Sequence, residues 1–280
     1  MTASVDTAAF RLAPSPAEQL LRDGQPEAAL QALVAQVRQA PADASARLFL
    51  CQLFAACGQW TRARDQLDVA MRLDSGNALL CATWQALIDA EAARTAVFAG
   101  EALPTVIGAP ADWLAAVLEA LRLDGRGEHA AAAALRSHAF EAAPAVSGQI
   151  DGQAFAWLAD ADPRFGPCLE LVLQGGYGWV PFERIARLAF DAPASLADTL
   201  WAPVEVTWRN GGQAHGYVPV RYPGSEHLDE PGLRLGRATG WTALADDTWA
   251  GQGQRMFTTD AGDHPLLEIR VVTFDAADAG

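Results

Sequence analysis

The chain has 280 residues, of which 51% are hydrophobic and 19% are charged, and its formal net charge is −14. This length is sufficient for one large domain or two domains of ordinary size. All 20 cationic side chains are arginines, which excludes chemistry that needs a lysine, such as a pyridoxal Schiff base or a GxxxxGK(S/T) phosphate loop. The acidic balance argues against nucleic acid and anionic membrane surfaces as partners, because binding to them needs clustered cations.

The sequence predicts a cytoplasmic protein without membrane insertion. No apolar run approaches the roughly 20 residues of a membrane helix. The first residues contain Asp6 where a signal peptide has cations, and they lack an apolar core segment. The four cysteines have no C-x-x-C spacing and are too sparse for a disulfide framework, so we expect them to be buried apolar residues.

A repeat of about 34 residues is visible in the first half. Three glycines are each followed at the same distances by an alanine and then by a proline or a serine: Gly24, Ala29 and Pro41; Gly58, Ala63 and Ser75; Gly127, Ala132 and Pro144. This resembles the tetratricopeptide pattern, in which the small residue lets two helices approach and the proline ends the second helix. The unit expected near residues 79–110 lacks this frame. We predict roughly seven helices between residues 16 and 147, stacked as a short solenoid with a concave face.

The hydrophobic pattern becomes alternating from about Asp162, which predicts strands. Glycine-rich turns predict hairpins of residues 169–174 with 177–180 and of residues 204–209 with 213–220. A third hairpin is predicted from residues 255–259 and 266–274. One or two short helices are expected over residues 182–188 and 196–201.

These patterns predict an α+β multidomain protein. Tetratricopeptide-like all-α repeats are followed by a small antiparallel β-rich domain that contains one or two short helices. The predicted boundaries are a flexible tail at 1–15, helical repeats at 16–147, a partly docked linker at 148–165, the β-rich domain at 166–275 and a tail at 276–280.

Several motifs in the second half resemble those of the ImpE/TagJ family, accessory proteins of the bacterial type VI secretion system. They are Trp179-Val-Pro-Phe-Glu-Arg-Ile185, Trp201-x-Pro203, Trp208-x-Asn210-Gly-Gly212, Arg221-Tyr-Pro-Gly-Ser-Glu226, Gly251-x-Gly-Gln-Arg255 and Pro265-Leu-Leu267. The resemblance covers nearly the whole chain. It implies an acidic, cytoplasmic, non-enzymatic protein whose partner is TssB, the small contractile-sheath subunit, bound through a short helical segment. It also implies a link to the AAA+ ATPase ClpV, and no cofactor.

The motif residues have two interpretations. Arg221, Tyr222 and Glu226 are expected to border a partner surface, because arginine and tyrosine are typical interface anchors. Further candidates for this surface come from the neighbouring motifs: Trp179, Trp208 and Asn210. Alternatively, Arg221 pairs internally with a carboxylate while Pro223 and Gly224 form a turn. Some of the arginines in or beside these motifs are also expected in internal ion pairs that shape the β-rich domain: Arg184, Arg187, Arg221 and Arg255.

The alternative function is a small-molecule hydrolase or metal-dependent enzyme built on the β-rich domain. Its candidate residues are the Glu226-His227-Leu-Asp229-Glu230 cluster for a metal, and Ser225 with His215 or His264 for nucleophilic catalysis. The cluster lies between two prolines and is typical of a solvated loop, so we expect no metal site and no catalytic residue. A general scaffold with several partners is a third interpretation.

Overall fold

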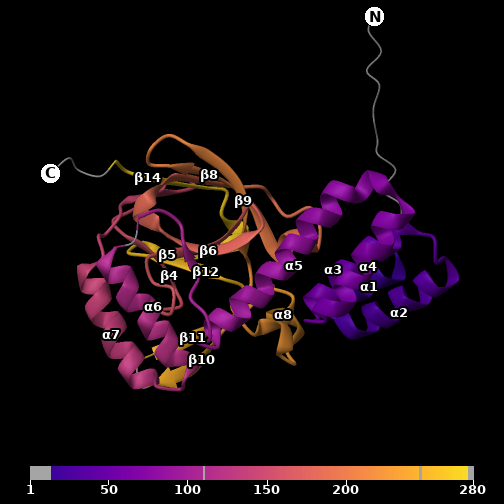
Figure 1. The fold of residues 1–280 in the computed structure, drawn as a ribbon, viewed down its shortest axis with the longest axis horizontal. Helices are drawn as coiled ribbons and strands as arrows, with labels where there is room; N and C mark the ends of the chain where they lie inside the picture. Colours follow the sequence, from indigo (N-terminus) through magenta and orange to yellow (C-terminus); the bar gives the residue numbers. More distant parts are fainter. Residues whose placement is uncertain (1–13, 110, 246–247, 277–280) are drawn as a thin grey trace, which may run out of the picture.

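The structure is a computed structural model that describes residues 14–109, 111–245 and 248–276. A helical region and a β-rich region pack side by side, with α5 running across the boundary between them (Figure 1). Apart from residues 14, 15 and 276, the tails predicted at 1–15 and 276–280 lie outside the described residues. Within the described ranges, no helix has both the length and the apolar character needed to cross a bilayer.

The helical region contains the seven helices that the repeat pattern predicts. They are α1 (Pro16–Arg22), α2 (Pro26–Gln39), α3 (Ala44–Ala56), α4 (Trp60–Leu73), α5 (Ala78–Phe98), α6 (Asp112–Gly125) and α7 (His129–Ala142). Helix α1 begins at a capping box, in which the Ser15 hydroxyl accepts from the Glu18 backbone N–H and the Glu18 carboxylate accepts from the Ser15 N–H.

The repeat glycines lie in the turns of three helical hairpins. Gly24, Gly58 and Gly127 have φ values of 71°, 66° and 79°, in the left-handed region that favours glycine at helix ends. The alanines that follow them are fully buried: Ala29, Ala63 and Ala132. Pro41 and Pro144 lie just beyond the ends of α2 and α7.

Helix α5 interrupts the predicted solenoid. It spans 21 residues without a paired second helix, and it packs against α4, α6 and the sheet. The segment after it forms β1 (Thr105–Val106), which pairs in parallel with β6 (Gly176–Pro181). As a result, α6 and α7 lie beside the β-rich region, away from α1–α4 (Figure 1).

Within the described residues, the β-rich region contains three sheets. The largest has nine strands in the order β1-β6-β5-β9-β8-β7-β14-β2-β3, and β13-β12-β4 and β10-β11 form the other two. Apart from β1 and β6, the strands are β2 (Gly148–Ile150), β3 (Gln153–Phe155), β4 (Leu158–Asp160), β5 (Cys168–Leu173), β7 (Ile185–Phe190), β8 (Trp201–Trp208), β9 (Gln213–Pro219), β10 (Thr239–Ala245), β11 (Thr248–Gly253), β12 (Met256–Thr259), β13 (Gly262–Pro265) and β14 (Val271–Phe274). The helical turns between them are η2 (Phe182–Arg184), η3 (Ala197–Thr199), η4 (Ser225–His227), α8 (Pro231–Arg234) and η5 (Leu266–Glu268), while η1 (Ser75–Asn77) connects α4 to α5.

The first two predicted hairpins are confirmed as β5–β6 and β8–β9. The third prediction is wrong in its return strand, since β12 pairs with β13 at residues 262–265. The turn η5 then redirects the chain, and β14 pairs with β7 and β2 in the large sheet. The helix predicted at 182–188 is also wrong, because one 3-10 turn is followed directly by β7; the element at 196–201 is the 3-10 turn η3.

The segment 148–165, predicted as a partly docked linker, contains strands β2, β3 and β4. Strand β2 pairs with β14 and β3, and β4 pairs with β12. This segment therefore contributes to two of the three sheets.

Strand β5 lies between two hydrophobic cores. Leu169 and Leu171 belong to a core within the β-rich region, whereas Cys168 and Val172 belong to a larger core shared with the helices. Because side chains alternate along a strand, Glu170 lies on the helix-facing side with Cys168 and Val172, and its side chain is fully buried. A buried carboxylate at this boundary requires partners.

Candidate partner-binding groove

Four of the six side chains predicted to border a partner surface are buried in the molecule: Trp179, Arg221, Tyr222 and Glu226. Trp208 is half-buried at the end of β8. Asn210 is exposed in the following turn, where its Oδ1 accepts a hydrogen bond from the Gly212 backbone N at 3.0 Å. The buried four are not open to a partner, so a partner surface has to be formed by other residues.

Arg221 closes the C-terminal end of α3. Its Nη1 donates to the carbonyl oxygens of Ala56 and Arg234, both at 2.7 Å, and its Nη2 donates to that of Ala55 at 3.3 Å. The last carbonyls of a helix lack helical partners and carry partial negative charge, which favours a cation there. Burial nevertheless lowers the pKa of Arg221. Its role is internal, as one interpretation predicts, but its partners are backbone carbonyls instead of a carboxylate.

A buried ion network joins α5 to the sheet. Arg94 of α5 donates from Nε and Nη2 to the two carboxylate oxygens of Glu170 at 2.8 and 2.7 Å. Its Nη2 also donates to the Arg221 carbonyl oxygen at 2.7 Å. Arg255 bridges Glu170 and Asp160. Such bidentate pairs fix the geometry of both partners.

The motif aromatics complete this network. The Tyr177 hydroxyl donates to Glu170, and Trp179 Nε1 donates to the Tyr177 hydroxyl oxygen at 2.8 Å. The Tyr222 hydroxyl donates to Asp160 Oδ1 at 2.9 Å. Trp179 and Tyr222 are therefore held inside the molecule by the polar groups that they satisfy.

The two carboxylates of the network have pKa values shifted in opposite directions. Burial alone would raise the pKa of Glu170, but Arg94 and Arg255 outweigh it, and this pKa lies below its usual value. For Asp160, burial outweighs Arg255 and raises the pKa to about 7. Arg255 forms the expected internal ion pair, with the carboxylates of the network, whereas Arg184 and Arg187 pair with Glu183 and Glu205 in partly exposed positions.

Ser225 does not form the serine–histidine arrangement that the hydrolase alternative requires. Its hydroxyl donates to the Tyr222 carbonyl oxygen at 2.6 Å and accepts from the Gly253 backbone N at 2.8 Å. Neither His215 nor His264, which lie on β9 and β13, is among its hydrogen-bond partners. The serine stabilises a loop, so it gives the hydrolase alternative no support.

The acidic segment after Ser225 serves the local backbone. The Glu230 carboxylate accepts from the backbone N of Gly232 at 2.9 Å and of Leu233 at 2.7 Å, which caps α8. Across the described ranges, no group of three or more His, Cys, Asp and Glu side chains is placed to hold a metal ion.

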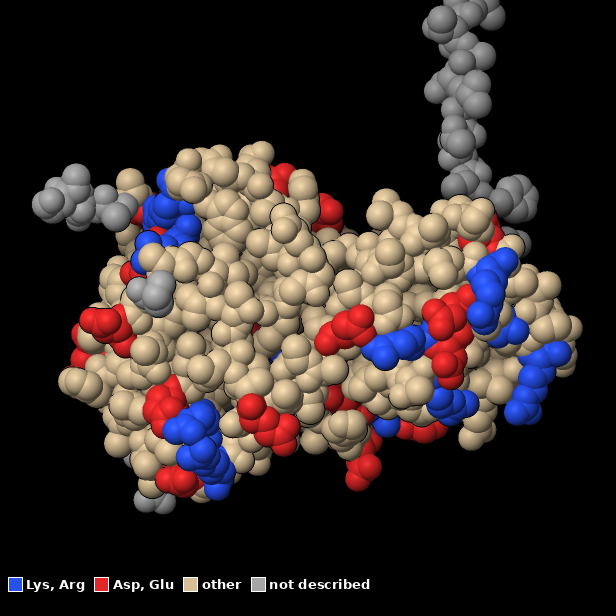
Figure 2. All heavy atoms as spheres, viewed as in Figure 1, with Lys and Arg blue, Asp and Glu red and all other residues tan. Residues whose placement is uncertain are grey.

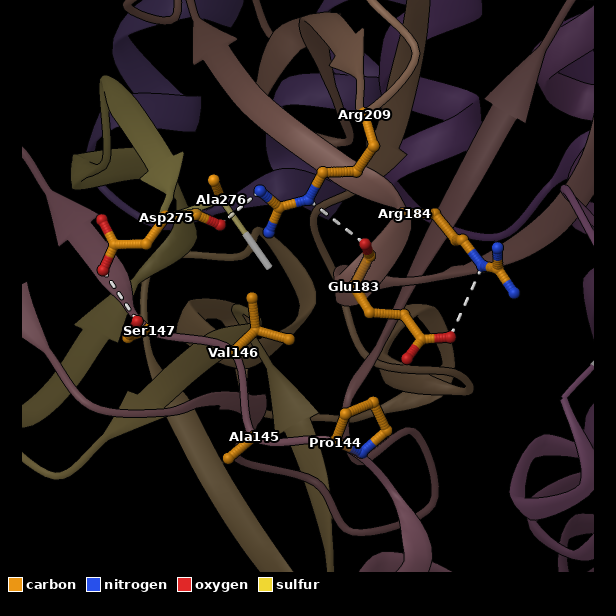
Figure 3. A pocket seen from close by; sticks show the side chains of 9 residues that line it. All are labelled: Pro144, Ala145, Val146, Ser147, Glu183, Arg184, Arg209, Asp275 and Ala276. Atoms are coloured by element: carbon orange, nitrogen blue, oxygen red, sulfur yellow. Dashed lines mark hydrogen bonds and ion pairs between the residues drawn. The ribbon is translucent and has the colours of Figure 1, made fainter. Parts of the chain in front are cut away.

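A cleft of about 400 Å³ lies where the segment after α7 meets the end of β14 (Figure 3). In it, the Ser147 hydroxyl donates to Asp275 Oδ2 at 2.7 Å, and Arg209 Nε donates to the Glu183 carbonyl oxygen at 3.3 Å. Arg184 Nε lies 3.4 Å from Glu183 Oε1. These polar groups are paired with one another, and no histidine is among the residues that line the cleft. The cleft therefore offers no imidazole base beside Ser147.

The helical block contains a groove of about 350 Å³ over α3, with α2 and α4 as its walls. Consecutive turns of each helix line it: Val34, Val37 and Arg38 of α2, Arg47, Leu50 and Phe54 of α3, and Arg62, Asp65 and Gln66 of α4, with Pro41 between α2 and α3. The floor is apolar and the rim is polar, which is the arrangement of protein–protein interfaces.

Three arginines surround this floor. Arg47 Nε donates to the Pro41 carbonyl oxygen at 2.9 Å, and its Nη1 donates to Gln66 Oε1 at 3.0 Å. The Arg62 guanidinium lies 4.1 Å from the centroid of the Phe54 ring. Figure 2 shows blue and red side chains interspersed over the helical block.

The repeat pattern predicts a solenoid with a concave face, but it does not identify the residues that line this groove. Val34 and Val37 fit the core periodicity, and that pattern does not reveal that Arg38 follows on the same helix face. The available signal was an arginine beside the apolar stripe on each of three successive helices.

The fold and the groove define the class of the protein: a tetratricopeptide-like helical block with an open groove, joined to a β-rich domain. The tetratricopeptide repeat family model matches residues 20–83, and the ImpE protein family model matches residues 152–273.

The chain is 45% identical to the type VI secretion system accessory component TagJ of Pseudomonas aeruginosa, over 94% of this chain and 92% of that protein. The crystal structure of protein VPA1032 from Vibrio parahaemolyticus has the same fold, with a TM-score of 0.86 and 23% identity over 95% of this chain and 99% of that chain. The chain therefore belongs to the ImpE/TagJ family.

Proposed function

We propose that this chain is a non-enzymatic adaptor of a bacterial type VI secretion system that acts in the cytoplasm. It binds a helical segment of the small contractile-sheath subunit, TssB, and thereby tunes assembly or disassembly of the sheath. The ATPase ClpV is the second partner in this proposal. The similarity to TagJ over almost the whole chain supports the secretion-system role.

The observation that carries the proposal is the groove over α3. Val34 is the partly exposed apolar residue of its lining and lies above the buried Leu50, Phe54 and Val37, and an amphipathic helix binds an apolar groove by placing its apolar face in it. Among the described residues, only α2, α3, α4 and the short α2–α3 connection line this groove. No segment from the rest of the described chain occupies it.

The test is titration of the full chain with the intact sheath subunit and with a peptide of its helical segment, followed by calorimetry. We expect a Kd below about 100 μM, equivalent to roughly −5.5 kcal/mol. The variant Val34→Glu, which places a charge in the groove, should weaken binding at least about tenfold. Leu79→Glu is the matched control, because Leu79 is 81% exposed on α5 and does not line the groove.

Absence of binding by the unmodified chain at about 100 μM would overturn the proposal. Equal loss of affinity in the Val34 and Leu79 variants would place the partner outside the groove.

A further inference from the structure

We infer that the groove over α3 selects an acidic amphipathic helix, in which carboxylates flank an apolar stripe. The inference deepens the proposed function and rests on it for the identity of the natural partner. It rests on the groove itself for the chemistry of the segment that binds.

The charge of the groove is opposite to that of the whole chain. The net charge is −14, yet the groove is lined by Arg38, Arg47 and Arg62 and by a single acidic residue, Asp65. Among the residues that the structure describes, no carboxylate lies within 4.0 Å of a side-chain nitrogen of these three arginines. Cations that are left unpaired around an apolar floor are complementary to carboxylates of another chain, even though this protein as a whole is acidic.

Arginines elsewhere on the same block differ in their pairing: among the described residues Arg64 forms an ion pair, whereas Arg22 and Arg72 form none. Arg64 of α4 forms an ion pair with Asp89 of α5, and Arg234 of α8 forms one with Glu27 of α2. What distinguishes Arg38, Arg47 and Arg62 is their common position around one groove, where Asp65 is the single acidic lining residue.

Two of the three groove arginines, Arg47 and Arg62, are held in place before a partner arrives. The ring of Phe54 supports the Arg62 guanidinium, and Arg62 Nη1 donates to Gln59 Oε1 at 2.6 Å. The contacts of Arg47 with Pro41 and Gln66 occupy its Nε and Nη1 and leave Nη2 without a partner in this arrangement. A planar guanidinium fixed in this way binds a carboxylate with less loss of conformational freedom.

The positions of the arginines determine the pattern that a ligand must carry. Arg38 lies on the α2 wall, Arg62 on the α4 wall and Arg47 on α3 between them. A helix lying on the floor would therefore meet cations on both flanks of its apolar stripe. Glutamates or aspartates on those flanks match the groove, whereas lysines there would be repelled.

The test uses the full chain and three designed helical peptides of about 20 residues that share one apolar face. Glutamate, glutamine or lysine occupies the positions flanking that face, and fluorescence anisotropy gives each Kd. We expect the glutamate peptide to bind about ten to a hundred times more tightly than the glutamine peptide, as three partly desolvated ion pairs predict. The lysine peptide should bind most weakly.

The triple variant Arg38→Gln, Arg47→Gln, Arg62→Gln should lose this preference. The matched control is Arg22→Gln, Arg64→Gln, Arg72→Gln, which removes the same charge from arginines of the same block that do not line the groove. A double variant, Arg38→Gln with Arg62→Gln, keeps the Arg47 contacts and guards against a loss caused by misfolding. Equal affinities for the glutamate and glutamine peptides, no peptide binding at all, or equal loss in groove and control variants would overturn the inference.

Binding measurements with the sheath segment separate a failure of this inference from a failure of the proposed function. If the sheath segment does not bind but the glutamate preference holds, the proposed function fails and the inference stands. If the sheath segment binds the groove-arginine variant as tightly as the unmodified chain, the inference fails and the proposed function stands.

Discussion

Arg221 illustrates how an arginine in a family-like motif serves the interior of the protein. Three backbone carbonyls, from α3 and α8, surround its guanidinium. The side chain thereby connects the helical block to the segment that follows β9. Its motif is a junction between the two regions, and the surface open to partners lies on other residues.

We expect Arg221→Met to lower the free energy of unfolding by about 3 kcal/mol, because buried carbonyl groups lose their donors. Urea denaturation at pH 7 measures this loss. Arg237→Met is the control, since Arg237 is exposed and contacts only the Arg22 carbonyl oxygen, at 3.2 Å. The assignment is contradicted if the two variants lose equal stability.

Asp160 gives the fold a dependence on pH. Burial raises its pKa to about 7, whereas an aspartate in an unfolded chain titrates near about 3.9. The folded state therefore holds a proton there that the unfolded chain releases. The contribution to stability is complete below about pH 4 and is lost as the pH rises through about 7.

Asp160→Asn should consequently flatten the fall in unfolding free energy between about pH 4 and 7, by up to about 1.4 kcal/mol per pH unit. Urea denaturation of both proteins at several pH values measures the slopes, with Asp263→Asn on the exposed end of the β12–β13 hairpin as control. Parallel curves for the unmodified chain and Asp160→Asn would show that this carboxyl does not titrate as described.

At the scale of elements, the α3–α4 turn is also a contact with the β-rich region. Gly58 has φ +66°, and a Cβ there would lie 2.9 Å from Glu226 Cγ and 3.2 Å from His227 Cε1. Gly24 occupies the equivalent α1–α2 turn with φ +71°, but a Cβ there meets nothing within 4 Å. The two turns share a conformation and differ in their surroundings.

Alanine substitutions at these turns should therefore differ in cost. Gly24→Ala should lower the free energy of unfolding by about 1 kcal/mol through backbone strain alone. Gly58→Ala should lower it by about 2–3 kcal/mol, because it adds a steric clash with Glu226. Chemical denaturation of both variants gives the comparison, and equal losses would mean that the loop yields to the added methyl group without cost.

Elements whose pattern is local could be predicted from the sequence. The glycines of the helical hairpins and the Gly175-Gly176 and Asn210-Gly211 turns locate α1–α4, β5–β6 and β8–β9. The errors occur where the partner is distant. Residues 182–188 contain a pattern compatible with a helix, but pairing of β7 with β8 and β14 imposes a strand after one turn.

The candidate site, like the fold, could be predicted from the sequence only where its pattern is local. The Trp179, Arg221 and Tyr222 motifs could be found in the sequence, but their burial depends on residues such as Arg94 and Asp160, which lie more than 60 positions away from Tyr222 or Arg221. The groove arginines are spread over three helices, and only the packing of those helices brings them around one floor. Contacts between distant segments were therefore the part that the sequence did not predict.

At the scale of the whole molecule, the helical and β-rich regions share one core. The larger hydrophobic cluster extends from α1 to α7 and includes Phe165, Trp179, Trp201 and Tyr222 of the β-rich region. The Arg94–Glu170 pair crosses the same boundary. The regions are consequently expected to unfold together.

Differential scanning calorimetry should show one transition with equal calorimetric and van't Hoff enthalpies. Glu170→Gln should lower the midpoint of that single transition by about 5–10 °C, because it leaves two buried guanidinium groups short of a carboxylate. Two separable transitions, or a change confined to one of them, would contradict a shared core.

Binding of the small sheath subunit in the groove is tested most directly by hydrogen exchange of the full chain with and without that subunit. The bound subunit should slow exchange in α2, α3 and α4, over residues 34–66 that line the groove. Exchange in the β10–β11 hairpin should stay unchanged. Protection confined to the β-rich region, with no change in these three helices, would contradict the groove as the partner surface.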